Sequence, residues 1–169
     1  MDAGYEYRVV FFCMGNICRS PTAHGVFRQR LQDRNLHQRV AVSSAGTHAY
    51  HVGEPPDPRS QHHARLRGYD LADLRARQLT ALDCERADLL LAMDWDNLAL
   101  AEALCPPPHR RKLRRLTEFC RHHDSPVVPD PYYGGADGFE HVLDLIEDAC
   151  DGLLDHIERV LAARVDARH

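Results

Sequence analysis

One segment near the amino terminus combines a cysteine, an arginine and a serine at a spacing that suits phosphate chemistry. The run from Cys13 to Ser20 reads CMGNICRS, so five residues separate the thiol of Cys13 from the guanidinium of Arg19. Five intervening residues let a loop curl until several backbone N–H groups point into one concavity, which suits an oxyanion. Arg19 would add a planar fork of donors that matches two phosphate oxygens. The segment predicts a phosphate-binding loop that starts with a cysteine nucleophile.

The other residues of the loop fit this interpretation. They are Met14, Gly15, Asn16, Ile17 and Cys18. Gly15 and Asn16 tolerate the tight or left-handed backbone that such a loop needs. Ser20 is placed to donate its hydroxyl to the sulfur of Cys13, and nearby positive charge favours a thiolate there. The alternative is a buried cysteine that an arginine follows by chance, and the position of the motif between a strand and a helix disfavours it.

The pattern along the chain predicts where this loop sits. Nearly continuous apolar runs predict strands at residues 7–12, 40–45, 87–93 and 113–116. Helical periodicity and breakers predict helices over 20–35, 58–68, 96–104 and 138–164, the first with Ser20 as cap and Pro21 at its first position. Alternating strands and helices indicate an α/β fold: one doubly wound domain over residues 1–169, with a central four-stranded parallel sheet flanked by helices on both sides. Ligands bind such sheets beyond the carboxyl ends of the strands, where the CMGNICRS loop lies.

A second motif, which contains an aspartate, could supply the proton that a leaving oxygen needs. Asp130 stands in the run PDPYYGG, and the proline that follows holds it in an extended conformation. By itself this motif would read as an aspartate that begins a turn. Together with the Cys13 loop it predicts a general acid.

With these motifs, the sequence resembles the low-molecular-weight protein tyrosine phosphatase family. The resemblance is carried by CMGNICRSP and then by SAGT at 44–47, VG at 52–53, DPR at 57–59, ARQ at 76–78, MD at 93–94 and DPYY at 130–133, all in the family's order. It implies a cysteine-dependent phosphoric monoester hydrolase that cleaves phosphotyrosine and small aryl phosphates through a phosphocysteine, with Cys13, Arg19 and Asp130 as the catalytic residues. It implies no metal and no cofactor.

The resemblance also implies supporting residues. Ser44 would hydrogen-bond Asn16 and hold the loop, and Asp94 would support the site or cap a helix. Tyr132 and Tyr133 would wall one side of a deep crevice and Tyr50 the other, although the family often has a tryptophan and an asparagine where this chain has Tyr50 and His51. A reversible Cys13–Cys18 disulfide would shield the nucleophile; otherwise Cys18 is a small packing residue.

Composition limits the partners. The net charge is −4, which disfavours a broad nucleic-acid surface, and no apolar run is long enough to span a bilayer. With no signal-peptide pattern at the amino terminus, we expect a cytoplasmic monomer whose six cysteines are mostly reduced. The expected partners are a phosphotyrosine protein, with a tyrosine kinase as one candidate, and inorganic phosphate as product. The basic run at 110–115 reads as a solvated patch or as a docking surface for an acidic partner.

Two rival functions share some of these features. Thioredoxin-coupled arsenate reductases have a similar loop but need two further cysteines close together downstream, whereas Cys84 and Cys105 are twenty-one residues apart. A catalytically idle phosphate-binding module would have lost Cys13, Arg19 or Asp130, and all three are present. Both are therefore less favoured than the phosphatase.

Overall fold

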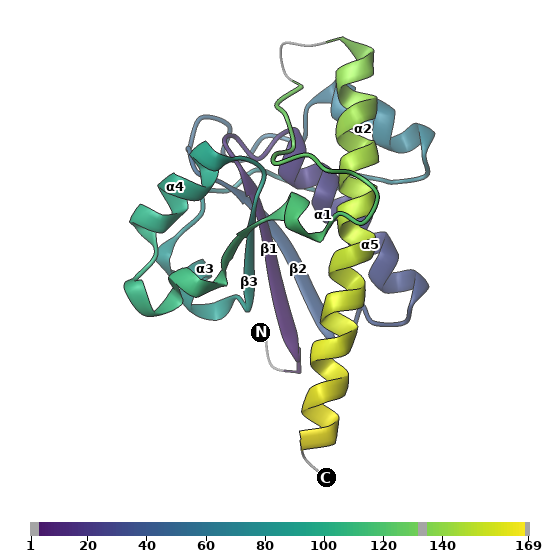
Figure 1. Cartoon of the computed structure of the whole chain (residues 1–169). Helices are drawn as coiled ribbons and strands as arrows, with labels where there is room; N and C mark the ends of the chain where they lie inside the picture. Colours follow the sequence, from purple (N-terminus) through teal and green to yellow (C-terminus); the bar gives the residue numbers. More distant parts are fainter. Residues whose placement is uncertain (1–3, 132–134, 168–169) are drawn as a thin grey trace.

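The computed structural model describes residues 4–131 and 135–167. Its core is a four-stranded parallel sheet in the order β2-β1-β3-β4 (Figure 1). The strands are β1 (Tyr7–Cys13), β2 (Val40–Gly46), β3 (Leu89–Ala92) and β4 (Leu113–Arg115). All three neighbouring pairs are parallel, as the predicted α/β fold requires.

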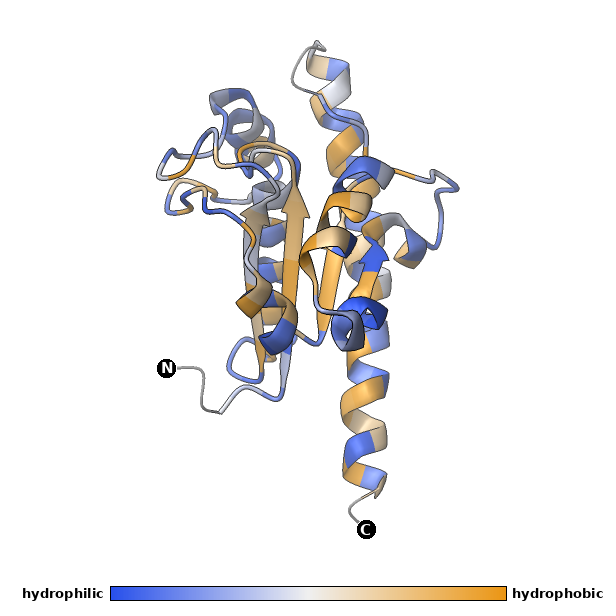
Figure 2. Cartoon of the chain, turned by 90° about the vertical axis from the view of Figure 1, so that its left-hand side faces the viewer, coloured by the Kyte–Doolittle hydropathy of each residue, from blue (hydrophilic) through white to orange (hydrophobic). Residues whose placement is uncertain are grey.

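Helices cover both faces of the sheet. On one face, α1 (Arg19–Asp33) and α5 (Ala136–Ala167) pack on Val9 and Phe11, while α3 (Ala81–Arg86) and α4 (Trp95–Leu104) pack against Val10 and Phe12 on the other. The two cores differ because successive residues of a strand point to opposite faces. Figure 2 shows the apolar strands enclosed between these layers. The remaining elements are α2 (Pro58–Leu66) and two 3-10 turns, η1 (Pro107–Lys112) and η2 (Leu116–Phe119).

Two helices differ from the sequence prediction, one in where it begins and one in that it was not predicted. The first helix begins at Arg19 with Cys18 as its N-cap, so Ser20 is not the cap as predicted; its hydroxyl bonds inside the phosphate loop instead. The short helix α3 was not predicted, although Thr80 and Asp83 form a capping box there. Six residues are too few for a helical period to show in the sequence.

The structure shows one exception to the expectation that the cysteines are mostly reduced. Cys84 and Cys105 form a disulfide, whereas the other four are free. Cys84 lies on α3, which precedes β3, and Cys105 follows α4, which returns from the far end of β3. The disulfide therefore lies toward the amino ends of the strands. Sequence separation was a poor guide here, because a returning helix brings distant positions together.

The basic run keeps exposed side chains at Arg110 and Arg111, as a solvated patch requires, but two of its side chains also bond within the fold. Lys112 Nζ donates to the carbonyls of Cys84 and Glu85, at 2.9 and 3.0 Å. Arg110 Nε donates to the carbonyl of Cys105 at 3.1 Å. These bonds satisfy carbonyls beside the disulfide and at the ends of short helices.

Helix α5 holds the segment that leads toward Asp130. The Asp148 carboxylate accepts the backbone N–H groups of Arg121, His122 and His123 at 2.9–3.0 Å, together with the His123 ring. Burial opposes the charge of Asp148, but these donors outweigh it and lower its pKa to about 2.

Among the described residues, none of the helices combines the length and the apolar character that a membrane span needs.

Candidate active site

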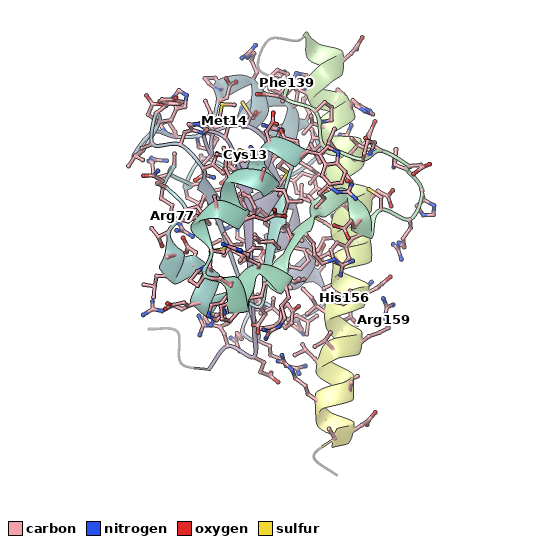
Figure 3. The ribbon with its side chains drawn as sticks, turned by 60° about the vertical axis from the view of Figure 1, so that its left-hand side comes forward. Cys13, Met14, Arg77, Phe139, His156 and Arg159 are labelled. Atoms are coloured by element: carbon pink, nitrogen blue, oxygen red, sulfur yellow. A yellow bond between two sulfur atoms is a disulfide. The ribbon has the colours of Figure 1, made fainter. Side chains whose placement is uncertain are left out.

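The CMGNICRS loop lies at the carboxyl end of β1, where the fold was expected to place it. Cys13 is the last residue of β1 and is buried, with its Sγ 3.1 Å from the hydroxyl of Ser20. Asn16 Nδ2 donates to the same hydroxyl oxygen at 2.8 Å, so the Ser20 proton can be donated either to the sulfur or to the carbonyl of Ala45, which lies 3.3 Å away. In Figure 3, Cys13 and Met14 lie in the upper part of the view, whereas His156 and Arg159 lie lower, on α5.

Asn16 holds the loop in a conformation that few residues adopt. Its φ is 59°, in the left-handed region, and its Oδ1 accepts the backbone N–H of Arg77 at 3.1 Å. The prediction that Ser44 bonds Asn16 is wrong. Ser44 Oγ instead lies 3.0 Å from Nδ1 of His24 on α1, because Ser44 faces the α1 layer of the sheet.

His24 was not singled out from the sequence. Burial, reinforced by the nearby charge of Arg28, lowers its pKa to about 4, so the imidazole is neutral at pH 7. Its hydrogen bond links α1 to β2 just behind the phosphate loop. No sequence signal separates His24 from the chain's eleven other histidines, since its partner Ser44 is twenty residues away.

Backbone contacts from other segments fix the rest of the loop. The N–H groups of Thr47 and His48 donate to the carbonyls of Cys13 and Met14, at 2.8 and 2.9 Å, and the N–H of Asp57 donates to that of Ile17 at 2.8 Å. Gly46 permits this approach: a Cβ there would lie 2.8 Å from the carbonyl oxygen of Met14. This close passage gives a physical role to the glycine of the SAGT motif.

Arg19 joins the loop to the acidic segment. Its buried guanidinium donates from Nη1 to Asp94 Oδ2 at 2.7 Å and to the carbonyl of Val128 at 3.0 Å, and its Nη2 lies 3.8 Å from Asp130 Oδ2. Burial opposes its charge, but Cys13, Asp94 and Asp130 outweigh that effect and raise the pKa of Arg19 above its usual value. The arginine therefore stays charged where an anion would bind.

A cavity of about 320 Å³ opens over the loop. Its lining comprises Cys13, Met14, Gly15, Ile17, Cys18 and Arg19 from the loop segment, and Tyr50, His51 and Asp130 from other segments. Tyr50 is 73% exposed and stacks on His48, with ring centroids 5.0 Å apart. Tyr132 and Tyr133, predicted for the opposite wall, lie outside the described residues.

His51 also contributes to this cavity, although it was not predicted as a site residue. Its Cδ2 lies 2.9 Å from the position that a Cβ on Gly15 would occupy, and its Nδ1 lies 2.5 Å from Glu54 Oε2. The imidazole therefore packs directly on the phosphate loop. The only signal in the sequence was its place next to Tyr50.

A cysteine, an arginine and a carboxylate thus converge on one cavity, and comparison with known proteins identifies the family. The model of the family described as low molecular weight phosphotyrosine protein phosphatase matches residues 8–163. The chain belongs to this family. A low molecular weight protein-tyrosine-phosphatase of Streptomyces coelicolor is 42% identical over 164 residues, which cover 94% of this chain and 98% of the relative.

Comparison with solved structures agrees with this assignment. The crystal structure of a protein tyrosine phosphatase from Entamoeba histolytica matches with a TM-score of 0.88 and 37% identity, over 90% of this chain and 97% of that one. YfkJ from Bacillus subtilis matches with a TM-score of 0.84 and 33% identity, over 93% and 98% of the two chains. The protein is thus a tyrosine phosphatase by family, and this family works by cysteine-based chemistry.

The disulfide bears on the rival arsenate reductase. Cys84 and Cys105 do meet, so their separation of twenty-one residues does not exclude the cysteine pair that such a reductase needs. They lie toward the amino ends of the strands, however, whereas Cys13 of this phosphatase ends β1. A pair at that end of the sheet is poorly placed to exchange a disulfide with Cys13, and the family match independently favours the phosphatase.

Proposed function

We propose that this phosphatase hydrolyses phosphotyrosine with Cys13 as nucleophile, Arg19 as phosphate ligand and Asp130 as general acid and base. The Cys13 thiolate attacks phosphorus, the bond from phosphorus to the tyrosine oxygen breaks, and Asp130 gives that oxygen a proton. A water molecule then attacks the phosphocysteine while Asp130 takes a proton from it. The sulfur–phosphorus bond breaks, which releases inorganic phosphate and restores the thiolate.

The observation that carries this proposal is the position of Arg19 between the two reacting groups. Its guanidinium is buried in the loop that Cys13 begins, and it approaches the Asp130 carboxylate to 3.8 Å. A phosphate bound by the loop would therefore have the sulfur on one side and the carboxylate near its leaving oxygen. The charge of Arg19 and the loop amides would stabilise the equatorial oxygens in both transition states.

We further propose phosphotyrosine proteins as substrates, with a tyrosine kinase as one candidate. The exposed ring of Tyr50 at the cavity suits a stacked phenyl group, and a cavity floor below it would be out of reach of phosphoserine. Tyr132 and Tyr133 remain the predicted opposite wall.

Cys18 is proposed to protect the nucleophile by forming a disulfide with an oxidised Cys13. Both thiols are buried, free and line the same cavity. Burial raises the pKa of Cys18 to about 12, so Cys18 is a neutral thiol that does not compete as a nucleophile in the resting enzyme.

A cytoplasmic location also remains a proposal. The mechanism needs Cys13 as a free thiol, which a reducing compartment maintains. The Cys84–Cys105 disulfide weighs in the other direction, but it is buried and so shielded from soluble reductants. Counting free thiols in protein taken directly from its cells would test the proposal: four or more free thiols with Cys13 among them support it.

Hydrolysis of para-nitrophenyl phosphate and of a phosphotyrosine peptide, in the presence of EDTA, tests the mechanism. We expect turnover by the wild type, none by Cys13→Ser, and a kcat lowered about 100-fold or more in Asp130→Asn, since a positioned acid contributes about 10²–10⁴-fold. Asp137→Asn is a matched control, because Asp137 is an exposed aspartate at the start of α5. No turnover by the reduced wild type would overturn the proposal, and arsenate with thioredoxin would be the next assay.

A further inference from the structure

The only tryptophan of the chain is exposed next to the active site. Trp95 is the first residue of α4 and 54% of its surface is accessible. Tryptophan has the largest apolar surface of any side chain, and its exposure is typical of places where another molecule binds. The start of α4 does not depend on the indole, since Asp94 caps the helix through its bond to the N–H of Asn97 at 2.8 Å.

A positive charge lies on one face of the indole. Cζ of Arg115, at the end of β4, is 4.0 Å from the ring centroid, and its Nη1 donates to the carbonyl of Pro126 at 2.6 Å. Within residues 4–131 and 135–167, no carboxylate forms an ion pair with Arg115; the nearby Glu118 pairs with Arg114 instead. Trp95 and Arg115 together therefore present an apolar ring beside a cation that no acidic side chain of the described residues neutralises.

This Trp95–Arg115 patch is connected to the catalytic groups on two sides. Asp94 binds Arg19 with one oxygen, so the covalent path places the Cα of Trp95 within about 10 Å of the guanidinium of Arg19. On the other side, the carbonyl of Pro126 that Arg115 binds is four residues before Asp130. In Figure 1 the start of α4 and the segment after η2 lie at the same end of the sheet.

We propose that the Trp95–Arg115 patch binds the polypeptide that flanks the phosphotyrosine, and that it prefers an acidic side chain there. This proposal rests on the proposed function, because it assumes that the phosphate occupies the Cys13 loop. An extended chain advances about 3.3 Å per residue, so a side chain about three residues from the phosphotyrosine would reach the patch. An acidic side chain would pair with Arg115 while its neighbour covers the indole.

Such a patch separates protein substrates from small ones. Para-nitrophenyl phosphate and free phosphotyrosine fill only the cavity over the loop, so they gain nothing from Trp95. A peptide gains apolar burial and one charge pair outside the cavity, and it does so equally in the ground state and in the transition state. The patch should therefore lower KM for peptides and leave kcat unchanged.

Steady-state kinetics with three substrates test the proposal. The substrates are para-nitrophenyl phosphate, a phosphotyrosine peptide with glutamates within four residues on both sides, and the same peptide with glutamines. We expect Trp95→Ala to raise KM for the glutamate peptide about tenfold and to leave para-nitrophenyl phosphate unchanged. Arg115→Gln should remove the preference for the glutamate peptide over the glutamine peptide.

Tyr5→Ala is the matched control. Tyr5 is an exposed aromatic residue that also has an arginine over its ring, Arg8 at 5.6 Å, but it precedes β1 and so lies at the opposite end of the sheet. We expect no change with any substrate. Equal losses on peptide and para-nitrophenyl phosphate in Trp95→Ala would show that the residue acts through Asp94 and would overturn the proposal, as would no loss on either.

Tryptophan fluorescence tests binding without turnover. Because Trp95 is the sole tryptophan, its quenching by acrylamide in the Cys13→Ser variant reports on this patch alone. We expect the glutamate peptide to protect Trp95 and free phosphotyrosine not to. Peptide without protection, or no binding of the peptide, overturns the proposal. If the wild type proves inactive but the peptide still protects Trp95, the proposed function fails and the docking patch stands.

Discussion

At the scale of single residues, one carboxylate serves two structural tasks at the active site. Asp94 Oδ1 accepts the N–H of Asn97 and caps α4, while Oδ2 accepts from Arg19 at 2.7 Å. The position of the Arg19 guanidinium, the proposed phosphate ligand, is therefore tied to the start of a helix. The two interpretations that the sequence left open for Asp94 are compatible, because a carboxylate has two oxygens.

His24 should make stability depend on pH. Its pKa is about 4 in the fold and 6.5 in the unfolded chain, so between these values the unfolded state binds more protons. Stability is thus complete above pH 6.5 and falls as the pH is lowered toward 4, by at most about 1.4 kcal/mol per pH unit. Urea unfolding at pH 7.5, 6 and 5 measures this slope.

His24→Gln should reduce that slope, whereas His62→Gln, at an exposed position on α2, should not. If His24→Gln keeps the wild-type slope, the buried imidazole is not its source. Asp148, with its pKa lowered from 3.8 to about 2, loses its contribution in a separate window, as the pH falls from 3.8 to about 2.

At the scale of elements, α5 passes so close to the end of η2 that only glycine fits. A Cβ on Gly152 would lie 1.9 Å from the carbonyl oxygen of Phe119, which is backbone and cannot move away by rotating a side chain. Together with Asp148, this contact fixes the start of the segment that runs to Asp130. The long helix therefore contributes to the site although no residue of it lines the cavity.

Gly152→Ala should destabilise the fold by about 2 kcal/mol or more, since overpacking costs about 1–3 kcal/mol and here the neighbour is backbone. Gly138→Ala is the matched control on the same helix: the nearest atom to its Cβ would be 3.8 Å away. There the gain in helix propensity should stabilise by about 0.5–1 kcal/mol. Thermal unfolding of both variants decides the point, and equal effects would contradict the close contact.

At the scale of the whole molecule, the two ends of the sheet have different tasks. The carboxyl ends hold the phosphate loop, Arg19 and the acidic segment, while the buried Cys84–Cys105 disulfide joins α3 to the end of α4 near the amino ends. Chemistry and covalent stabilisation are therefore separated by the length of the strands.

The double variant Cys84→Ala/Cys105→Ala should consequently lose stability and keep its activity. Closing a loop of this length is worth about 3 kcal/mol through the unfolded state. We expect a clearly lower Tm with kcat and KM for para-nitrophenyl phosphate unchanged. A loss of activity well below the Tm of the variant would show instead that the disulfide is coupled to the active site.

Local patterns in the sequence determined the sheet, most helices and the three residues of the proposed mechanism. The apolar runs indicate buried parallel strands, and the spacing from Cys13 to Arg19 indicates an anion-binding loop. Both features could be predicted because they depend only on residues that are close together in the sequence. Asp130 is far from Cys13 in the sequence, so only its motif and the family resemblance pointed to it. Helix α3 was not predicted, because six residues are too few to show a helical period.

The tertiary structure alone decided the contacts between distant segments. It paired Ser44 with His24 rather than with Asn16, gave Asn16 the backbone of Arg77, joined Cys84 to Cys105, and placed Arg115 on Trp95. Each of these depends on which face of a strand a residue occupies and on how a returning helix is positioned. Local propensity and spacing carry no information about such distances, because they are set by the packing of whole elements.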